Sequence, residues 1–454
     1  MAVIIDDARS RLRDVLGDRL FTPTDPGYDT ARLPWNRAVD QRPFAVALPR
    51  SDDEVAAIVR VAAASGLRIA PQSTGHGAGA RVDRDLSSTI LVSLENLRGA
   101  TVDPEARTAT VRGGSIWNDV VEAAAPHGLA TLHGSSGDVS VAGYTLGGGI
   151  SFYGRRHGLA VNAVRSVRVV TAQGTIVTAS ADENSDLFWA VRGASGGVGV
   201  VVSLEIDLLP YPDVFAGMML WDAARAAEVA HAWREWTVNA PESATTSMRI
   251  MHFPPIPELP PFLSGRSVIV IDGAVLETDA DAADLLAPLR ALQPEIDTFA
   301  RIPAARLVEM HMDPPEPSPA VTDHAMLDTL DAAAVDAFIA AANEHRPMMS
   351  EIRHVGGSFS RPAVDGGALT ALEGGYVLTA IAMVPAPAMM DAAAHAVSAV
   401  VAALSAWHGT GIALTFIEDD RDLAPAFGAG AARLSALRHE LDPDRVFAPA
   451  HGIA

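Results

Sequence analysis

The chain has 454 residues, 49% of them hydrophobic, which is enough for more than one buried core. Its formal net charge of −21 argues against nucleic acid and anionic membranes as partners. It contains no cysteine, which excludes disulfides, thiolate metal sites, iron–sulfur clusters and a cysteine nucleophile. It also contains no lysine, which excludes a Walker-type phosphate loop and a pyridoxal Schiff base.

The segment before residue 71 predicts a strand, a helix and a second strand. Phe44–Leu48 is a short apolar strand, and Ser51 with Glu54 matches a capping box in front of an amphipathic helix. Gly66 suits the position just after the end of that helix. Arg68–Ala70 then enters a loop of small residues, so the loop follows the second strand.

That loop, PQSTGHGAGA at residues 71–80, has the composition of an anion cradle. Such small residues leave backbone N–H groups uncovered for a pyrophosphate, and glycine permits the positive φ angles that a cradle needs. His76 is its one side chain suited to chemistry, the alternative being an ordinary loop histidine. No helical pattern follows, which disfavours a Rossmann site. A second glycine run, Gly147–Gly149, lies downstream, and we predict that both stretches hold one flavin.

Beyond the loop, the pattern predicts hairpins and then a second half of mixed order. Ser115 is expected to cap a helix, and Pro210 and Pro212 mark a boundary. Residues 213–408 intersperse strands with Ala-rich helices, which is an α+β pattern. The predicted elements are a strand at 89–94, hairpins at 100–102/108–111 and 167–171/175–179, strands at 200–208, 267–271 and 376–383, helices at 281–292, 332–343 and 388–407, and a last helix bearing Leu434, Leu437 and Leu441.

Five segments in this order resemble the FAD-linked oxidases of the vanillyl-alcohol oxidase type, which carry a PCMH-type FAD-binding domain, and especially their berberine-bridge-enzyme-like branch. They are QSTGHGAGA, VAGYTLGGGISFYGRRHGLAVNAV, DLFWAVRGASGGVGVVVSLEIDL, RHVGGSFSR and RLSALRHELDPDRVF. The resemblance implies an α+β, two-lobed PCMH-type FAD-binding fold with a separate α+β substrate domain. It implies an FAD-binding domain at 1–212, a substrate-binding domain at 213–408, and a C-terminal segment at 409–454 that returns to the FAD domain.

The resemblance also implies how FAD is held. The family's loop histidine, which is His76 here, is joined to the 8α-methyl carbon of the flavin. In part of the branch a cysteine makes a second bond, but Ser136 stands at that place, so attachment would be through His76 alone. The residues expected to bind the cofactor are Ser73, Thr74, Gly75, His76, Gly77, Ala78, Ser135, Ser136, Val139, Gly143, Thr145, Gly147, Gly148, Gly149, His157, Val200 and Val201.

The catalytic side chains have a weaker signal in the sequence. Hydride transfer to flavin N5 needs an oriented substrate and often a base for the departing proton. The tyrosine that serves some relatives as a base has no clear counterpart here. The sequence has no HExxH pattern or dense cluster of His and carboxylates, so we predict no metal. The candidates are Tyr153, His311 and His354, with Glu351 and Arg353 in the same region, and the alternative for each is a structural role.

We therefore expect an FAD-linked oxidase that takes a hydride from a small-molecule substrate and is reoxidised by dioxygen to give hydrogen peroxide. Two alternatives stay open: a flavin dehydrogenase that uses another acceptor, and a non-catalytic protein that binds flavin or ligand in the same fold. The N-terminal residues 1–18 are charged and lack the apolar core of a signal peptide. With no charge-free apolar span, the expected location is cytoplasmic, without membrane or nucleic-acid partners.

Overall fold

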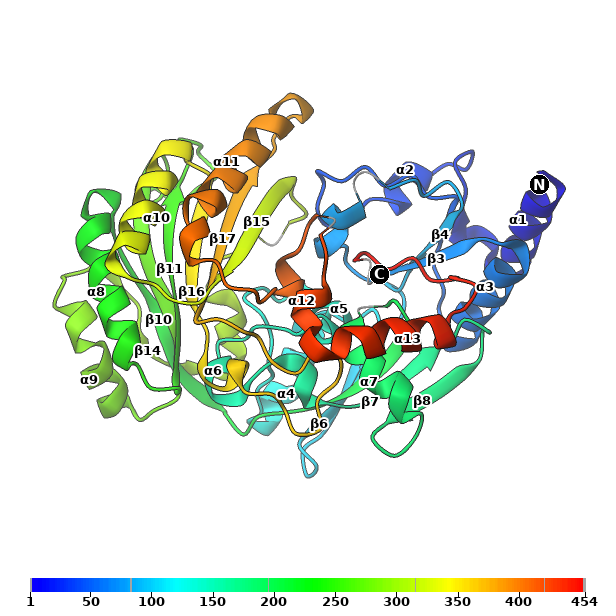
Figure 1. Cartoon of the computed structure of the whole chain (residues 1–454), viewed down its shortest axis with the longest axis horizontal. Coiled ribbons are helices and arrows are strands. Elements are labelled where there is room, and N and C mark those ends of the chain that lie inside the picture. The colour runs from blue at the N-terminus through cyan, green and yellow to red at the C-terminus, as the bar shows by residue number, and fades with distance from the viewer. Residues whose placement is uncertain (1, 82–83, 195, 315, 420, 452–454) are drawn as a thin grey trace.

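In the part of the chain that the structure describes, the strands form three sheets (Figure 1). The structure is a computed structural model that describes residues 2–81, 84–194, 196–314, 316–419 and 421–451. The first two sheets use strands between residues 20 and 207, and the third begins with β10 (Asp213–Asp222). We propose domain boundaries at residues 212 and 408. The first of them agrees with the chain's entry into the third sheet at Asp213.

The first sheet is small and mainly parallel, with the strand order β1 (Leu20–Phe21), β2 (Ala45–Ala47), β4 (Thr89–Ser93) and β3 (Arg68–Gln72). β2, β4 and β3 are parallel, and β1 is antiparallel to β2. One hydrophobic core joins this sheet to α1 (Ala2–Leu16) and α3 (Asp52–Ser65). Half of the predicted capping box is confirmed, since Ser51 Oγ accepts from the backbone N–H of Glu54 at 3.2 Å. The other half is wrong, because the Glu54 carboxylate accepts from the N–H of Arg50 at 2.7 Å rather than from that of Ser51. Gly66 follows the helix with φ of 66°.

The second sheet is antiparallel, with the order β5 (Ala100–Asp103), β6 (Thr108–Arg112), β9 (Val200–Asp207), β7 (Val164–Val170) and β8 (Ile176–Ser180). Both predicted hairpins are confirmed, as β5–β6 and β7–β8. The predicted cap of α4 (Trp117–Ala124) is wrong. Ser115 instead donates its hydroxyl to the carbonyl of Gly99 at 2.9 Å, and Asp119 Oδ2 accepts from the N–H of Ile116 at 3.0 Å. The N–H groups of Trp117 and Asn118, which a cap at Ser115 would have served, donate instead to the carbonyls of Val139 and Gly137 at 3.0 and 2.8 Å.

The third sheet is antiparallel, with the order β13 (Ile296–Asp297), β10, β12 (Ser267–Val275), β11 (Ala244–His252), β16 (Met349–His354), β17 (Tyr376–Met383) and β15 (Ala320–Leu327), while β14 (Ala300–Pro303) pairs with β10. One face is covered by α8 (Ala226–Asn239), α9 (Asp279–Arg290), α10 (Ala332–His345) and α11 (Met390–Ala403) (Figure 1). Ile250, Ile271 and Ile352 point into the core under these helices. Because side chains alternate along a strand, the residues between them point to the opposite face.

The end of the chain returns to the first sheet (Figure 1). The predicted last helix is confirmed as α13 (Ala431–Leu441). After it, Asp442 accepts from the N–H groups of Val446 and Phe447 at 2.7 and 2.8 Å. The backbone of Ile69 in β3 then bonds to Val446 and Ala448, each at 2.7 Å. Residues near the C-terminus therefore extend the edge of the sheet that carries the His76 loop.

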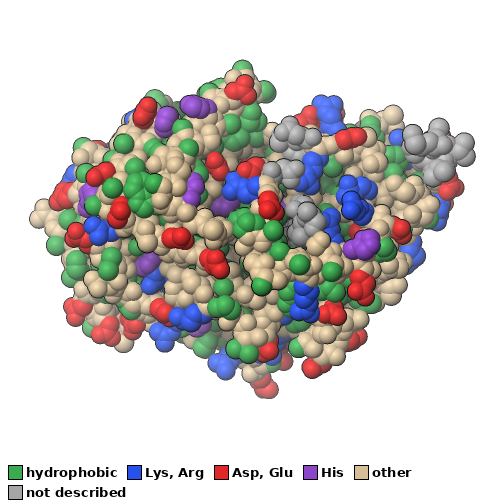
Figure 2. All heavy atoms as spheres, viewed as in Figure 1, with side chains coloured by type: hydrophobic (Ala, Val, Ile, Leu, Met, Phe, Trp, Pro, Cys, Tyr) green, Lys and Arg blue, Asp and Glu red, His purple; other side chains and the backbone are tan. Residues whose placement is uncertain are grey.

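Acidic side chains are spread over the face of the molecule shown in Figure 2, rather than gathered in one patch. This distribution agrees with the formal net charge of −21 as a property of the whole chain. Across the described residues, none of the helices has the length and apolar character needed to cross a bilayer.

Candidate active site

The His76 ring is held by three neighbours at the end of β3, where η2 (His76–Arg81) begins. It stacks on Trp35, with ring centroids 4.3 Å apart and planes inclined by 19°. Its Nδ1 lies 2.8 Å from the hydroxyl of Thr74. Its Nε2 is buried, lies 3.6 Å from Asp138 Oδ2, and has no hydrogen-bond partner among the described residues. The ring is therefore fixed in plane and rotation, with one nitrogen left without a hydrogen bond.

Asp138 brings the second predicted stretch, residues 134–149, against this ring. Trp35 Nε1 donates to Asp138 Oδ2 at 2.6 Å, and Ser136 Oγ donates to Oδ1 at 2.6 Å. Burial alone would raise the pKa of Asp138, but its contacts with His76, Ser136 and Trp35 outweigh burial and lower that pKa. An ionised carboxylate therefore stands where the two predicted stretches meet.

The residues around His76 fit a bound polar group. A buried polar atom without a partner costs about 1–3 kcal/mol, so a group of such atoms indicates a ligand. A Cβ built on Gly77 meets no atom within 4 Å, which leaves open space beside the ring. A cavity of about 240 Å³ is lined by Trp35, Ser73 and Thr74 among others, while His76 itself is not part of its lining. Among the described residues, the buried polar atoms without a hydrogen bond include Ser73 Oγ and His76 Nε2 in the loop, and Tyr144 Oη and Thr145 Oγ1 in α5 (Val141–Leu146).

The glycine run after α5 (Val141–Leu146) is required in part by the packing of the chain itself. Gly148 and Gly149 have φ of 112° and 75°, a region that L side chains rarely adopt. A Cβ on Gly148 would lie 2.9 Å from Leu369 Cδ2, and one on Gly149 would lie 2.6 Å from Tyr144 Cε1. Two of the three glycines thus have a structural reason that does not depend on a cofactor.

The other predicted cofactor residues lie in different surroundings. Val200 and Val201 are buried in β9 as parts of two hydrophobic cores. His157 Nε2 lies 2.9 Å from the hydroxyl of Tyr211, and burial lowers the pKa of His157. Gly75 precedes His76 with φ of 83°. Ala78 lies in η2, Gly143 and Thr145 lie in α5, Gly147 follows that helix, and Val139 and Ser135 lie in the segment before it.

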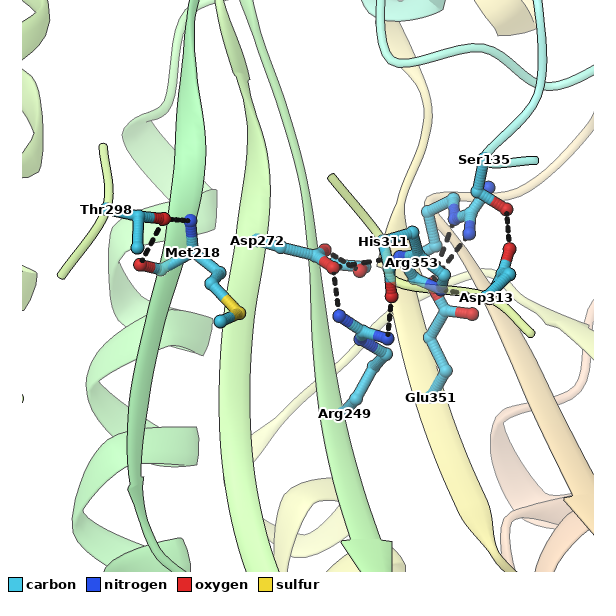
Figure 3. Close-up of polar contacts among 10 residues, drawn as sticks. Ser135, Met218, Arg249, Asp272, Thr298, His311, Asp313, Glu351 and Arg353 are labelled. Carbon is cyan, nitrogen blue, oxygen red and sulfur yellow. Dashed lines mark hydrogen bonds and ion pairs between the residues drawn. The ribbon is translucent and has the colours of Figure 1, made fainter. Parts of the chain in front are cut away.

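A cluster of charged side chains occupies the face of the third sheet that the helices do not cover (Figure 3). Each member is buried, with 5% or less of its surface exposed. Arg249 pairs in register with Glu351, and Ser247 pairs with both Asp272 and Arg353, so these side chains share one face. We call it the sheet-face cluster: Arg249 on β11, Asp272 on β12, Glu351 and Arg353 on β16, and His311 from the segment after η6 (Ala304–Glu309).

Asp272 is the centre of this cluster. It forms an ion pair with Arg249 and accepts a short hydrogen bond from the hydroxyl of Ser247. Burial would raise the pKa of Asp272, but the positive charge of Arg249 and the contact with His311 hold it below its usual range. Its Oδ2 lies 2.8 Å from His311 Nδ1. Because an ionised carboxylate only accepts, Nδ1 of His311 carries the hydrogen, and Nε2 keeps the lone pair in the neutral ring.

His311 also links the sheet to the stretch that contacts His76 (Figure 3). Its Nε2 lies 3.9 Å from Asp313 Oδ1. The other carboxylate oxygen of Asp313 accepts from Ser135 Oγ at 2.7 Å. Ser135 is next to Ser136, which bonds to Asp138. The short segment 135–138 therefore contacts both the His76 ring and Asp313, which lies beside His311 of the sheet-face cluster.

Arg353 is fixed by contacts from three parts of the chain. Its Nε donates to Glu351 Oε1 at 3.0 Å. Its guanidinium carbon lies 5.4 Å from the centre of the Phe152 ring and 5.9 Å from that of Phe416. Such cation–π contacts hold a guanidinium without using its in-plane N–H groups. Arg353 can thus present donors to an oxygen atom of a ligand above the sheet.

Tyr153 packs in a different cluster of aromatic side chains. It is fully buried, its ring stacks on Tyr211 at 5.6 Å, and its edge meets His133 at 6.2 Å. Its hydroxyl has no hydrogen-bond partner among the described residues. Burial raises the pKa of Tyr153, which disfavours the phenolate that a base would need.

His354 lies on the helix-covered face of β16, opposite to Arg353 on the same strand. It stacks on Tyr376 with centroids 5.1 Å apart and contacts Arg155. Of the three candidate catalytic residues, the structure therefore brings only His311 into the sheet-face cluster. Adjacent residues in a strand point to opposite faces, so His354 and Arg353 cannot serve one site.

The site residues predicted from the sequence do not include Trp35, Asp138, Arg249 or Asp272. Two of them had a usable signal, which is a charge inside an otherwise apolar strand. Asp272 interrupts SVIVIDGAV, and Arg249 interrupts SMRIMH. Charged residues are rarely buried unless paired, so such positions indicate a partner on a neighbouring strand. Trp35 and Asp138 had no comparable signal, because both lie in irregular segments.

The folded protein should lose stability in mild acid, because three of its histidines are buried. Burial lowers the pKa of His133 to about 4 and those of His324 and His354 to about 3. The unfolded chain takes up their protons below pH about 6.5, whereas the folded chain does not. Stability should therefore fall as the pH drops from about 6.5 toward 4, by up to about 4 kcal/mol per pH unit from these groups together.

Urea unfolding at a series of pH values measures this slope. His324→Asn should reduce the slope by the share of one histidine, even if it lowers stability at neutral pH. An unchanged slope in His324→Asn would contradict the assignment of that proton to His324.

Comparison with known families identifies part of this chain. Residues 43–180 match the family model described as FAD binding domain. The chain is 35% identical over 209 residues to (R)-6-hydroxynicotine oxidase of Paenarthrobacter nicotinovorans, which is 46% of this chain and 45% of that protein. It is 32% identical over 229 residues to xylooligosaccharide oxidase of Thermothelomyces thermophilus, which is 49% of this chain and 46% of that protein. The chain thus spans less than half the length of these curated relatives.

Solved structures match nearly the whole chain. BBE-like 1 of Physcomitrella patens superposes with a TM-score of 0.83 at 21% identity, covering 98% of this chain and 99% of that one. 6-Hydroxy-D-nicotine oxidase of Arthrobacter nicotinovorans gives a TM-score of 0.80 at 22% identity, covering 95% and 96%. The predicted α+β fold and the predicted resemblance are therefore confirmed, and FAD is the cofactor that the domain at 43–180 binds.

Proposed function

We propose that this chain, which carries an FAD-binding domain and has the fold of the berberine-bridge-enzyme-like oxidases, is an FAD-dependent oxidase of a small organic molecule. Its substrate would lose a hydride and a proton, and dioxygen would take up the two electrons and two protons as hydrogen peroxide. The names of the relatives, which include oxidases of 6-hydroxynicotine and of xylooligosaccharide, support a small organic molecule as the substrate.

The proposal is supported chiefly by the segment 134–139, which contacts both His76 and a neighbour of the sheet-face cluster. Asp138 in this segment lies against His76, and Ser135 bonds to Asp313 beside His311. A cofactor held at His76 and a substrate held on the sheet would therefore meet at this segment. Ligand sites occur preferentially between such parts of a chain.

The cofactor would be held by residues of the loop at 71–80 and of α5, where the hydroxyls of Ser73 and Thr145 are buried without a hydrogen-bond partner among the described residues. Ser73 and Thr145 would donate to it, Gly77 would leave it room, and His76 would form one covalent bond to it. FAD bound in this place supplies the acceptor for the substrate's hydride. Ser136 carries no thiol, so a second covalent bond is not available to this chain.

The sheet-face cluster would bind the substrate and take its proton. Arg353 would donate to a substrate oxygen, and Glu351 would keep the guanidinium in place. Nε2 of His311 would accept the proton of the substrate's O–H or N–H group, since Asp272 holds the hydrogen on Nδ1. The carboxylate of Asp272 would then stabilise the imidazolium, as a buried carboxylate does in a Ser-His-Asp triad.

Anaerobic spectroscopy on the purified holoprotein tests this function. We would add a panel of alcohols, amines and oligosaccharides without dioxygen, and then mix the reduced protein with air-saturated buffer. The expected result is bleaching of the flavin by at least one compound, followed by fast reoxidation and release of hydrogen peroxide. Bleaching with slow reoxidation would indicate a dehydrogenase. Tight binding of ligands without any bleaching would indicate a non-catalytic protein.

A further inference from the structure

We propose that Asp138 is a positioning residue for the covalent attachment of FAD to His76. This inference rests on the proposed single bond between His76 and the flavin. Asp138 would hold the hydrogen of His76 on Nε2, so that the other nitrogen attacks the 8-methyl carbon, and its negative charge would stabilise the imidazole as the bond forms.

Both oxygens of Asp138 are directed by hydrogen bonds from other side chains. Trp35 Nε1 donates to Oδ2 and Ser136 Oγ donates to Oδ1, each at 2.6 Å. The same Oδ2 lies 3.6 Å from His76 Nε2. Trp35 therefore both stacks on the His76 ring and aims the carboxylate at its edge. Both side chains of the Asp138–His76 pair are 23% exposed, so water weakens this contact only in part.

The position of the carboxylate decides which nitrogen is the nucleophile. A carboxylate beside Nε2 favours the tautomer that carries its hydrogen there, which leaves the lone pair on Nδ1. Thr74 is the hydroxyl partner of Nδ1, and it can donate to that lone pair until the bond forms. Without Asp138, the two tautomers would be nearer in energy, and a smaller share of the protein would be ready to react.

Attachment would form one C–N bond and would reduce the flavin by two electrons. The 8-methyl group of oxidised flavin loses one proton, the imidazole loses its N–H proton, and a bond forms between the imidazole nitrogen and the methyl carbon. The ring system of the flavin gains two electrons and two protons, and dioxygen then removes them as hydrogen peroxide. Asp138 stays ionised before the step because its contacts hold its pKa below the usual value, so its negative charge would stabilise the imidazolium as the bond forms. The imidazole proton would then pass to water, since both side chains of the pair are 23% exposed.

Intact mass spectrometry measures the covalent fraction directly and needs no substrate. We would purify the wild type, Asp138→Asn and Trp35→Phe, and follow the gain of mass during incubation with added FAD. An opposite charge within about 4–6 Å changes a protonation equilibrium by about 10- to 1000-fold, so Asp138→Asn, which removes this charge, should attach FAD more slowly by a factor in that range. Trp35→Phe keeps the stacking but loses the donor to Asp138, and it should be slowed by a smaller factor.

Asp207→Asn is the matched control, because Asp207 forms an exposed ion pair with Arg165 in the same half of the chain. It should attach FAD at the wild-type rate. Attachment in Asp138→Asn at the wild-type rate would overturn the inference while leaving the bond to His76 intact. A wild type that binds FAD without any gain of covalent mass would instead overturn the proposed bond itself. If Asp138→Asn fails to fold, wild-type kinetics in Trp35→Phe would still contradict the inference.

Discussion

Replacing His311 by Gln is expected to lower kcat by about 10²- to 10⁴-fold, with any substrate that reduces the flavin. Gln has a similar shape but cannot take up a proton. Nε2 of His311 keeps its lone pair because Asp272 accepts from Nδ1 at 2.8 Å. The change removes this acceptor and leaves the loop at 71–80 unaltered, so kcat should fall much more than KM rises.

Anaerobic stopped-flow reduction of the flavin measures this effect apart from reoxidation by dioxygen. His231→Gln is the matched control. His231 also pairs with a carboxylate, that of Asp336 at 2.8 Å, but the pair lies on the outer helices and is partly exposed. His231→Gln should reduce its flavin at the wild-type rate. If His311→Gln reduced its flavin at the wild-type rate, His311 would be excluded as the proton acceptor. Another group of the sheet-face cluster would then be the candidate for that role.

Removing the carboxylate of Asp272 is expected to destabilise the protein by about 3–5 kcal/mol. The side chain of Asp272 is fully buried and that of Arg249 is 3% exposed, so Asp272→Ala leaves a guanidinium without its charged partner in the interior. The same change also frees His311 from its orienting contact. Loss of stability and loss of activity should therefore occur together in this variant.

A double variant separates the cost of the unpaired charge from the cost of the lost packing. Arg249→Met combined with Asp272→Ala should recover much of the lost stability, because no buried charge is then left without a partner. Asp207→Ala breaks the exposed pair with Arg165 and should cost no more than about 1 kcal/mol. Urea unfolding of the four proteins gives these values. A cost for Asp272→Ala as small as that for Asp207→Ala would contradict the assigned role of Asp272.

The part of the site built from neighbouring residues could be predicted from the sequence. The loop at 71–80 has its small residues and its histidine within one short stretch, and the cap at Ser51 and the turn at Gly66 place that loop after β3. Local composition and local hydrogen bonding determine these features, so the sequence shows them directly. The predicted cap of α4 was wrong because the N–H groups of Trp117 and Asn118 bond to the carbonyls of Val139 and Gly137, which lie in a later segment of the chain.

The sheet-face cluster depends on pairing between strands that are far apart in the chain. Arg249 meets Glu351 only because β11 and β16 are neighbours with one particular register. Alternation within one strand separates Arg353 from His354, but it does not reveal which face lies under the helices. The pattern of a single strand therefore makes His311 and His354 equal candidates for the catalytic residue. Only His311 lies beside Asp272 in the structure.

Intact mass spectrometry after acid denaturation is the most direct test of a flavin held by His76. Wild-type protein should give a yellow pellet and a mass increased by one FAD. His76→Ala should lose both properties, while His127→Ala, which changes an exposed histidine, should keep them. A wild-type protein of unmodified mass, with its colour in the supernatant or with no flavin at all, would contradict the covalent site at His76.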